Sequence, residues 1–117
     1  MARALITPVA LTKTGYNLSD SSDFTVMGTG AGNGVQFAFD SHDFIVLKNG
    51  TGGDAVYTFK ILPETKYSDF GVTLPDDTIT VATTKTWVRP LSVIFRQTDG
   101  KVYVDCDVAA SILVLSP

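Results

Sequence analysis

His42, the only histidine of the chain, lies between Asp40 and Asp43, where it could take part in acid–base or metal chemistry. A serine nucleophile would need a Gly-x-Ser-x-Gly motif or a similar support, and the chain has no such motif. Zinc needs about three or four nitrogen or sulfur ligands, but the chain offers His42 and one cysteine, Cys106. We therefore predict no catalytic residue, no metal site and no enzyme, and interpret 40–43 as a polar turn before a strand.

Calcium, which binds oxygen ligands, stays open as an alternative. Asp40 with Asp43, or Asp76 with Asp77, could join backbone carbonyls around that ion. Neither pair has the spacing of an EF-hand, and aspartates at turn ends commonly bond the local backbone. We therefore predict that the chain has no cofactor.

Two further segments could carry chemistry by residue type. Cys106 shares one face of the alternating run 102–106 with Val102 and Val104, which predicts a buried, unreactive thiol. The glycine-rich segment 28–34 (GTGAGNG) resembles a phosphate loop, but no Lys-Ser or Lys-Thr pair follows it and the next residues alternate like a strand. Without a helix N-terminus there is no dipole for a phosphate, so we interpret this segment as a hairpin connection.

The composition excludes several classes of partner. The 117 residues make one domain, 1–117, with a net charge of −3 and nine basic residues that do not cluster. Binding to nucleic acid or to an anionic membrane needs a basic face, so neither is predicted. One cysteine allows no internal disulfide, which is typical of folding in a reducing cytoplasm. The N-terminal residues do not read as a signal peptide, and no apolar run is long enough to span a membrane.

Short apolar runs separated by turn residues predict eight or nine strands and no helix. The candidates are 24–27, 35–39, 44–47, 55–61, 78–81, 86–89, 91–95, 101–105 and 111–115. The continuous run 44–47 indicates a central strand, Asp99-Gly100 a tight turn, and Pro90 a bulge or a change of sheet. The longest irregular segment is 62–75. This pattern predicts an all-β, single-domain β-sandwich or barrel.

Aromatic side chains keep a second kind of site open. Trp87, Tyr57, Tyr67 and Tyr103 could stack on sugar rings if they were exposed, although each also fits a strand or a core. A carbohydrate-binding or host-adhesion module of a virion therefore remains an alternative function.

The order of elements from about 34 to 115 resembles that of the small head decoration proteins, or cement proteins, of tailed bacteriophages. The resemblance rests on 44–49 (FIVLKN), 56–61 (VYTFKI), 79–88 (ITVATTKTWV), 95–104 (FRQTDGKVYV) and a short apolar C-terminal strand. The chain departs from the family pattern at 89–91 (RPL) and in the longer segment 63–77.

The resemblance implies an antiparallel β-sandwich of the jelly-roll type and a structural, non-enzymatic role. Such proteins bind the outside of the phage head, contact the major capsid protein, often as homotrimers, and stabilise the capsid lattice. The protein is then expected on the head surface of a virion, after synthesis in the host bacterial cytoplasm. A tail-associated structural protein is an alternative placement.

The N-terminal segment is our candidate for contacts with other subunits. Residues 2–9 are largely apolar and precede the first clear sheet element. Residues 1–10 could therefore form an extended arm that reaches a neighbour, or an edge strand of their own domain. The predicted capsid or subunit contacts are Arg3, Leu5, Ile6 and Val9.

Overall fold

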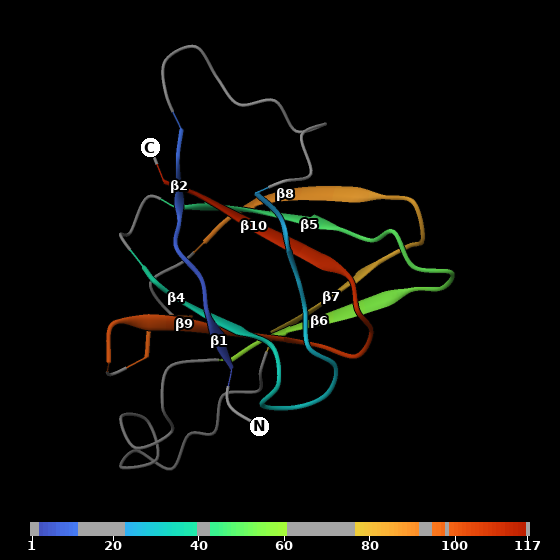
Figure 1. Ribbon diagram of the computed structural model, residues 1–117, viewed down its shortest axis with the longest axis horizontal. Coiled ribbons are helices and arrows are strands. Elements are labelled where there is room, and N and C mark those ends of the chain that lie inside the picture. Colours follow the sequence, from blue (N-terminus) through green and yellow to red (C-terminus); the bar gives the residue numbers. More distant parts are fainter. Residues whose placement is uncertain are drawn as a thin grey trace.

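The computed structural model describes residues 3–11, 23–39, 43–60, 77–91, 95–97 and 99–116. Within these ranges the chain forms ten strands and no helix (Figure 1). They are β1 (Ala4–Leu5), β2 (Val9–Ala10), β3 (Thr25–Val26), β4 (Val35–Ala38), β5 (Phe44–Lys48), β6 (Ala55–Phe59), β7 (Asp77–Val81), β8 (Thr86–Pro90), β9 (Lys101–Cys106) and β10 (Ser111–Ser116).

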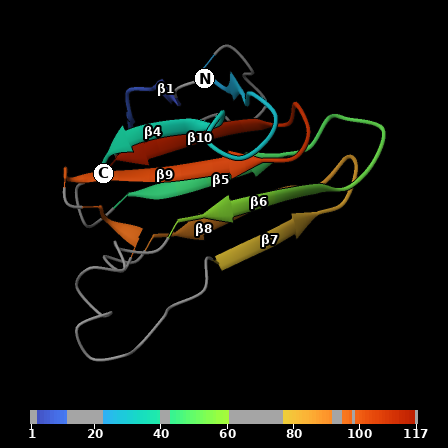
Figure 2. The ribbon, with the colours of Figure 1, turned by 90° about the horizontal axis from the view of Figure 1, so that it is seen from below.

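The strands form two packed sheets, so the prediction of an all-β, single-domain β-sandwich is confirmed. Sheet A has the order β1-β4-β9-β6-β7, and sheet B has the order β2-β10-β5-β8, with β3 also paired to β10. Figure 2 shows β1 at one side of the sandwich and β7 and β8 at the opposite side. From β4 to β10 the chain changes sheet at every connection except that between β6 and β7, and such crossings are typical of Greek-key and jelly-roll folds.

Most neighbouring strands are antiparallel, as predicted, and the exceptions lie at the N-terminus. β1 runs parallel to β4, and β2 runs parallel to β10. Of the predicted strand 91–95, Leu91 and Phe95 lie outside the strands, and 92–94 are not described. Pro90 ends β8 instead of forming a bulge, and the chain then crosses to sheet A. The predictions for Asp40, His42 and 62–75 lie outside the described residues.

Alternation along the strands builds the core between the sheets, because successive side chains of a strand point to opposite faces. Sheet A contributes Val35, Phe37, Tyr57, Phe59, Val102 and Val104, and sheet B contributes Ile45, Leu47, Ile112 and Val114. All are buried. This packing explains why the apolar residues recur at every second position in these strands.

A second apolar cluster covers the outer face of sheet B. Val46, Leu113 and Leu115 are buried there, and Val9, Leu11, Phe24 and Phe44 pack against them. β5 and β10 are therefore buried on both faces, which confirms the central strand predicted from the continuous run 44–47 and explains the similar run 112–115.

Asn49, which directly follows β5, joins two corners of the sandwich. Its amide nitrogen donates to the carbonyls of Gly53 (2.7 Å) and Val81 (2.8 Å). Its amide oxygen accepts from the backbone N–H (2.9 Å) and hydroxyl (2.6 Å) of Thr51. Its backbone N–H donates to the Lys85 carbonyl (3.1 Å). This buried amide thus fastens the turn after β5 to the end of β7 and the turn before β8.

Candidate functional site

The carboxylate of Asp105, on the outer face of sheet A, accepts four hydrogen bonds from distant parts of the chain. Arg3 donates from Nε to Oδ1 (2.8 Å) and from a terminal nitrogen to Oδ2 (2.6 Å). The backbone N–H groups of Gly32 and Gly34 donate to Oδ2 (3.1 Å) and Oδ1 (3.2 Å). Asp105 is only 5% exposed. One carboxylate therefore ties together the N-terminal segment, the glycine-rich segment and β9.

The glycine-rich segment 28–34 does bind an anion, but the anion is the chain's own Asp105. Backbone N–H groups that converge on one point can bind an anion without a helix. Gly32 adopts a φ of +80°, which side chains other than glycine rarely adopt. A Cβ at Gly34 would lie 2.0 Å from the Val104 carbonyl oxygen, so the close approach to β9 also requires glycine. The segment therefore binds a carboxylate of its own chain and is not the simple hairpin connection that we predicted. We call Asp105 with its partners Arg3, Gly32 and Gly34 the clasp.

Arg3 is held on its other side by an aromatic ring. Its guanidinium lies 4.8 Å from the centre of the Tyr103 ring, a cation–π distance. The Tyr103 hydroxyl donates to Asp99 (2.5 Å), and the side-chain amide of Gln36 donates to the Arg3 carbonyl (3.2 Å). These contacts fix the start of β1 against sheet A.

The ionisation of Asp105 depends on this clasp. Burial by itself raises the pKa of the carboxyl, but the hydrogen bonds and charge of Arg3 and the amides of Gly32 and Gly34 outweigh it and lower the pKa below its ordinary value. Since the folded-state pKa is below the unfolded value of about 3.9, the clasp stabilises the fold fully above that value. The contribution is lost as the pH falls through the folded-state pKa.

We therefore expect the difference in unfolding free energy between the unmodified chain and Asp105→Asn to be largest near neutral pH and to shrink below about pH 4. Denaturant unfolding followed by circular dichroism at several pH values measures this difference. Asp99→Asn is the control, because Tyr103 also lowers the pKa of Asp99 but this group is exposed. A gap for Asp105→Asn that stays constant from neutral pH to pH 2 would contradict the expectation.

The four predicted contact residues have different environments. Arg3 is engaged by Asp105, Ile6 packs against the main core and Val9 packs against the outer cluster of sheet B. Leu5 is 66% exposed and pairs with Gln36 on the outer face of sheet A. In the single chain, residues 4–10 thus form two edge strands, and Leu5 is the predicted contact that remains available to a partner.

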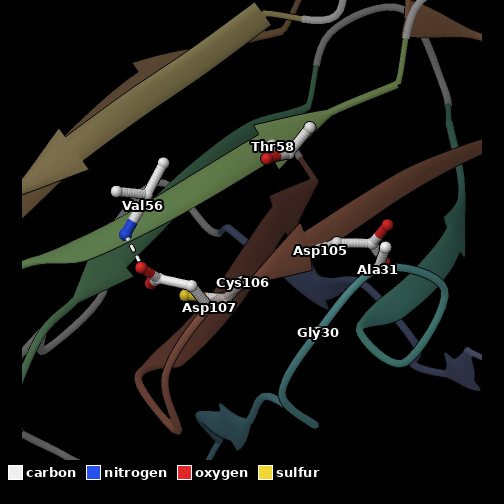
Figure 3. A pocket seen from close by; sticks show the side chains of 7 residues that line it. All are labelled: Gly30, Ala31, Val56, Thr58, Asp105, Cys106 and Asp107. Atoms are coloured by element: carbon white, nitrogen blue, oxygen red, sulfur yellow. Dashed lines mark hydrogen bonds between the residues drawn. The ribbon is translucent and has the colours of Figure 1, made fainter.

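An open hollow of 280 Å³ lies beside the clasp (Figure 3). It is lined by Gly30, Ala31, Val56, Thr58, Asp105, Cys106 and Asp107. Asp107 accepts the backbone N–H of Val56 (2.9 Å), and Asp105 is held by the clasp. Burial raises the pKa of the Cys106 thiol, and this residue is buried as predicted. Both carboxylates of the hollow are therefore engaged within the fold, and its thiol is not activated.

The acidic candidates for a metal site lie only partly within the described ranges. Over the described ranges, no three acidic, histidine or cysteine side chains are placed to hold a metal ion. Asp77 pairs instead with Arg89 (2.7 Å), Asp43 is buried, and Asp40 and Asp76 are not described.

Aromatic side chains do not form an exposed row in the described part of the chain. Tyr57 is buried and its hydroxyl donates to the Ser111 carbonyl (2.7 Å), while Tyr103 lies beneath Arg3. Trp87 is 47% exposed on β8, and Tyr67 is not described. Trp87 thus remains the one described aromatic candidate for a sugar contact.

Three exposed apolar side chains join Leu5 on the surface. From the sequence we named one of them, Trp87, as a candidate for sugar stacking, and we did not single out the other two, Val26 and Val88. Val26 is 64% exposed and Val88 is 56% exposed, both on the outer face of sheet B, and Trp87 stands at the edge formed by β8. In the sequence these residues alternate like those of any other strand. Their exposure follows from the positions of β3 and β8 at the margins of sheet B.

No family model, curated protein or solved structure matches this chain. The described residues contain no helix with the length and apolar character needed to cross a membrane.

Proposed function

We propose that this protein is a phage capsid decoration protein, which binds the major capsid protein on the outside of the head and stabilises the lattice. The observation that carries the proposal is the spread of exposed apolar side chains. Leu5 lies on the outer face of sheet A, Val26 and Val88 lie on that of sheet B, and Trp87 lies at the β8 edge. Exposed apolar side chains on both outer faces and at one edge are compatible with contacts to several neighbours, as a lattice protein makes.

The sequence resemblance and the internal clasp support the same role. A decoration protein has to hold its shape while contacts repeated over a lattice add through multivalency. The bonds of Asp105 fasten the N-terminal segment to the sandwich, so that Leu5 is presented from an ordered strand. The homotrimer and the head location remain part of this proposal, and a tail placement would use the same surfaces.

Sedimentation with expanded, undecorated heads tests the function. We expect the protein to bind at a fixed ratio to the major capsid protein, and Leu5→Asp to weaken binding by roughly 10-fold or more, because burying a leucine contributes about 1.5–3 kcal/mol. Thr7→Asp is the matched control, since it adds the same charge at another exposed position of the same segment.

Failure of the unmodified protein to bind the heads of its own virus would refute the proposal. Equal weakening by Leu5→Asp and Thr7→Asp would show instead that the contact is not apolar. Point variants serve better than deletion of 2–9, because that deletion also removes Arg3 from the clasp and Ile6 from the core.

A carbohydrate-binding role is the second candidate, and the exposed face of Trp87 favours it. Glycan-array binding that is lost in Trp87→Ala would support this role over the first. Silence on the array with and without calcium would count against it.

A further inference from the structure

β8 is the last strand of sheet B and has one described partner, β5. Four of its five residues, including Trp87 and Val88, are exposed. A sheet edge with exposed apolar side chains is a template for another strand, and proteins that avoid such pairing place charges or prolines along the edge. β8 has one proline, Pro90, at its end and one charge, Arg89, which pairs with Asp77 of its own chain (2.7 Å). The first three residues, 86–88, lack this protection.

The hydrogen bonds to β5 determine which backbone groups of β8 face outward. Leu91 N–H donates to the Asp43 carbonyl (3.2 Å), and Asn49 N–H donates to the Lys85 carbonyl (3.1 Å). Pro90 is paired with Phe44 and Thr86 with Lys48, and each pair lies next to one of these two bonds. Because hydrogen-bonded and non-hydrogen-bonded pairs alternate along an antiparallel ladder, both are non-hydrogen-bonded pairs. Val88, midway between them, is a third. The backbone groups of Thr86, Val88 and Pro90 therefore point away from β5, and Pro90 offers only its carbonyl.

We propose that β8 pairs antiparallel with β8 of a second copy of this chain, across a twofold axis through Val88. In this register the Val88 residues of the two copies exchange both backbone bonds. Thr86 of each copy donates to the Pro90 carbonyl of the other. The contact therefore has about four backbone hydrogen bonds, and the missing N–H of proline falls at its ends.

The neighbouring registers are poorer. An axis through Pro90 would place two residues without N–H groups at the centre of the ladder. An axis through Thr86 would bring Thr84, at a φ of +67° in the turn before β8, into the ladder.

The two nearest registers bring like charges together. An axis through Trp87 would also give about four backbone bonds, but it would place Lys85 opposite Arg89 of the other copy. An axis through Arg89 would place the two Arg89 side chains opposite each other. Like charges directly opposite are destabilising, so the residues of the strand favour Val88 as the centre.

The side chains are self-complementary in the same register. Val88 meets its own copy and extends the apolar outer face that Val46 begins. Trp87 comes opposite Arg89 of the other copy, and an arginine opposite an indole is a favourable cation–π pair. Arg89 already makes such contacts within the chain, at 5.1 Å from the centre of the Phe59 ring. Lys85 comes opposite Leu91, so no like charges meet.

This contact is independent of the proposed function, but it fits the geometry of a capsid lattice. A self-complementary patch makes a twofold contact, and in a hexagonal lattice neighbouring threefold positions are related by twofold axes. On a head, the β8 contact would therefore join neighbouring trimers, while in free protein it would join two copies.

Disulfide trapping of the free protein tests the proposal. Residues paired across such an axis have Cα atoms about 5.5 Å apart, within the usual disulfide range of about 4.4–6.8 Å. We expect Val88→Cys to form a covalent dimer under mild oxidation. Val26→Cys is the matched control, because Val26 is as exposed and lies on the same outer face, but on β3 at the other side of sheet B. The unmodified chain gives the background, since Cys106 is buried.

Light scattering provides a second measurement without oxidation. Where the unmodified chain associates, we expect Val88→Asp to lower the average mass about 2-fold or more and Val26→Asp to leave it unchanged. Equal trapping of the two cysteine variants, or no trapping and no mass change for the Val88 variants, would overturn the proposal. Neither experiment uses heads, so loss of head binding with intact trapping would count against the proposed function alone.

Discussion

Asp105→Ala is expected to lower the free energy of unfolding by about 3 kcal/mol or more. The substitution leaves the Arg3 guanidinium without its carboxylate and the N–H groups of Gly32 and Gly34 without their acceptor. Removing one partner of a mostly buried ion pair costs more than the pair itself contributes, because the remaining charge stays desolvated. Denaturant unfolding followed by circular dichroism measures the change.

Asp107→Ala is the control for this prediction. Asp107 is two residues along the chain, exposed, and accepts one bond, from Val56 N–H, so its loss is expected to cost about 1 kcal/mol or less. The double substitution Arg3→Ala with Asp105→Ala should cost less than the sum of the single ones, since the two groups act as a pair. Additive effects, or equal losses for Asp105→Ala and Asp107→Ala, would contradict the role of the clasp.

Asn49→Ala is expected to destabilise the fold by about 3 kcal/mol. The amide side chain serves Gly53, Val81 and Thr51 at once, and each buried group that loses its partner costs about 1–3 kcal/mol, with partial relief where water enters. Thermal and denaturant unfolding should both report the loss.

Asn33→Ala provides the comparison, because the Asn33 amide makes one exposed bond, to the Thr29 carbonyl (2.9 Å). Its removal is expected to change the unfolding free energy by about 1 kcal/mol or less. Asn49→Asp should resemble Asn49→Ala, since a carboxylate accepts but cannot donate to the two carbonyls. If Asn49→Ala were no more destabilising than Asn33→Ala, the buried amide would not be the fastening that we describe.

The candidate contacts were only partly accessible to sequence reasoning. The apolar N-terminal residues looked alike in sequence, yet Ile6 and Val9 pack inside the domain while Leu5 does not. Their environments depend on β1 joining sheet A and β2 joining sheet B, and two-residue strands carry too few residues to show a period.

What the sequence by itself determined is the fold class and much of the core. Alternation in 102–106 put Val102 and Val104 on one face of a strand, since successive side chains of a strand point to opposite faces. The apolar run 44–47 marked a strand buried on both sides. The sequence also placed Cys106 on the inner face, and burial there keeps its thiol protonated.

Only the tertiary structure decided what the polar residues do. Asp105 meets Arg3 across nearly the whole chain, and 28–34 grips that carboxylate because the loop folds back over β9. Similarly, Val88 is exposed while its partner Val46 is buried, because β8 ends the sheet and β5 lies within it. Such outcomes depend on which distant segments become neighbours, and local residue patterns carry no record of that pairing.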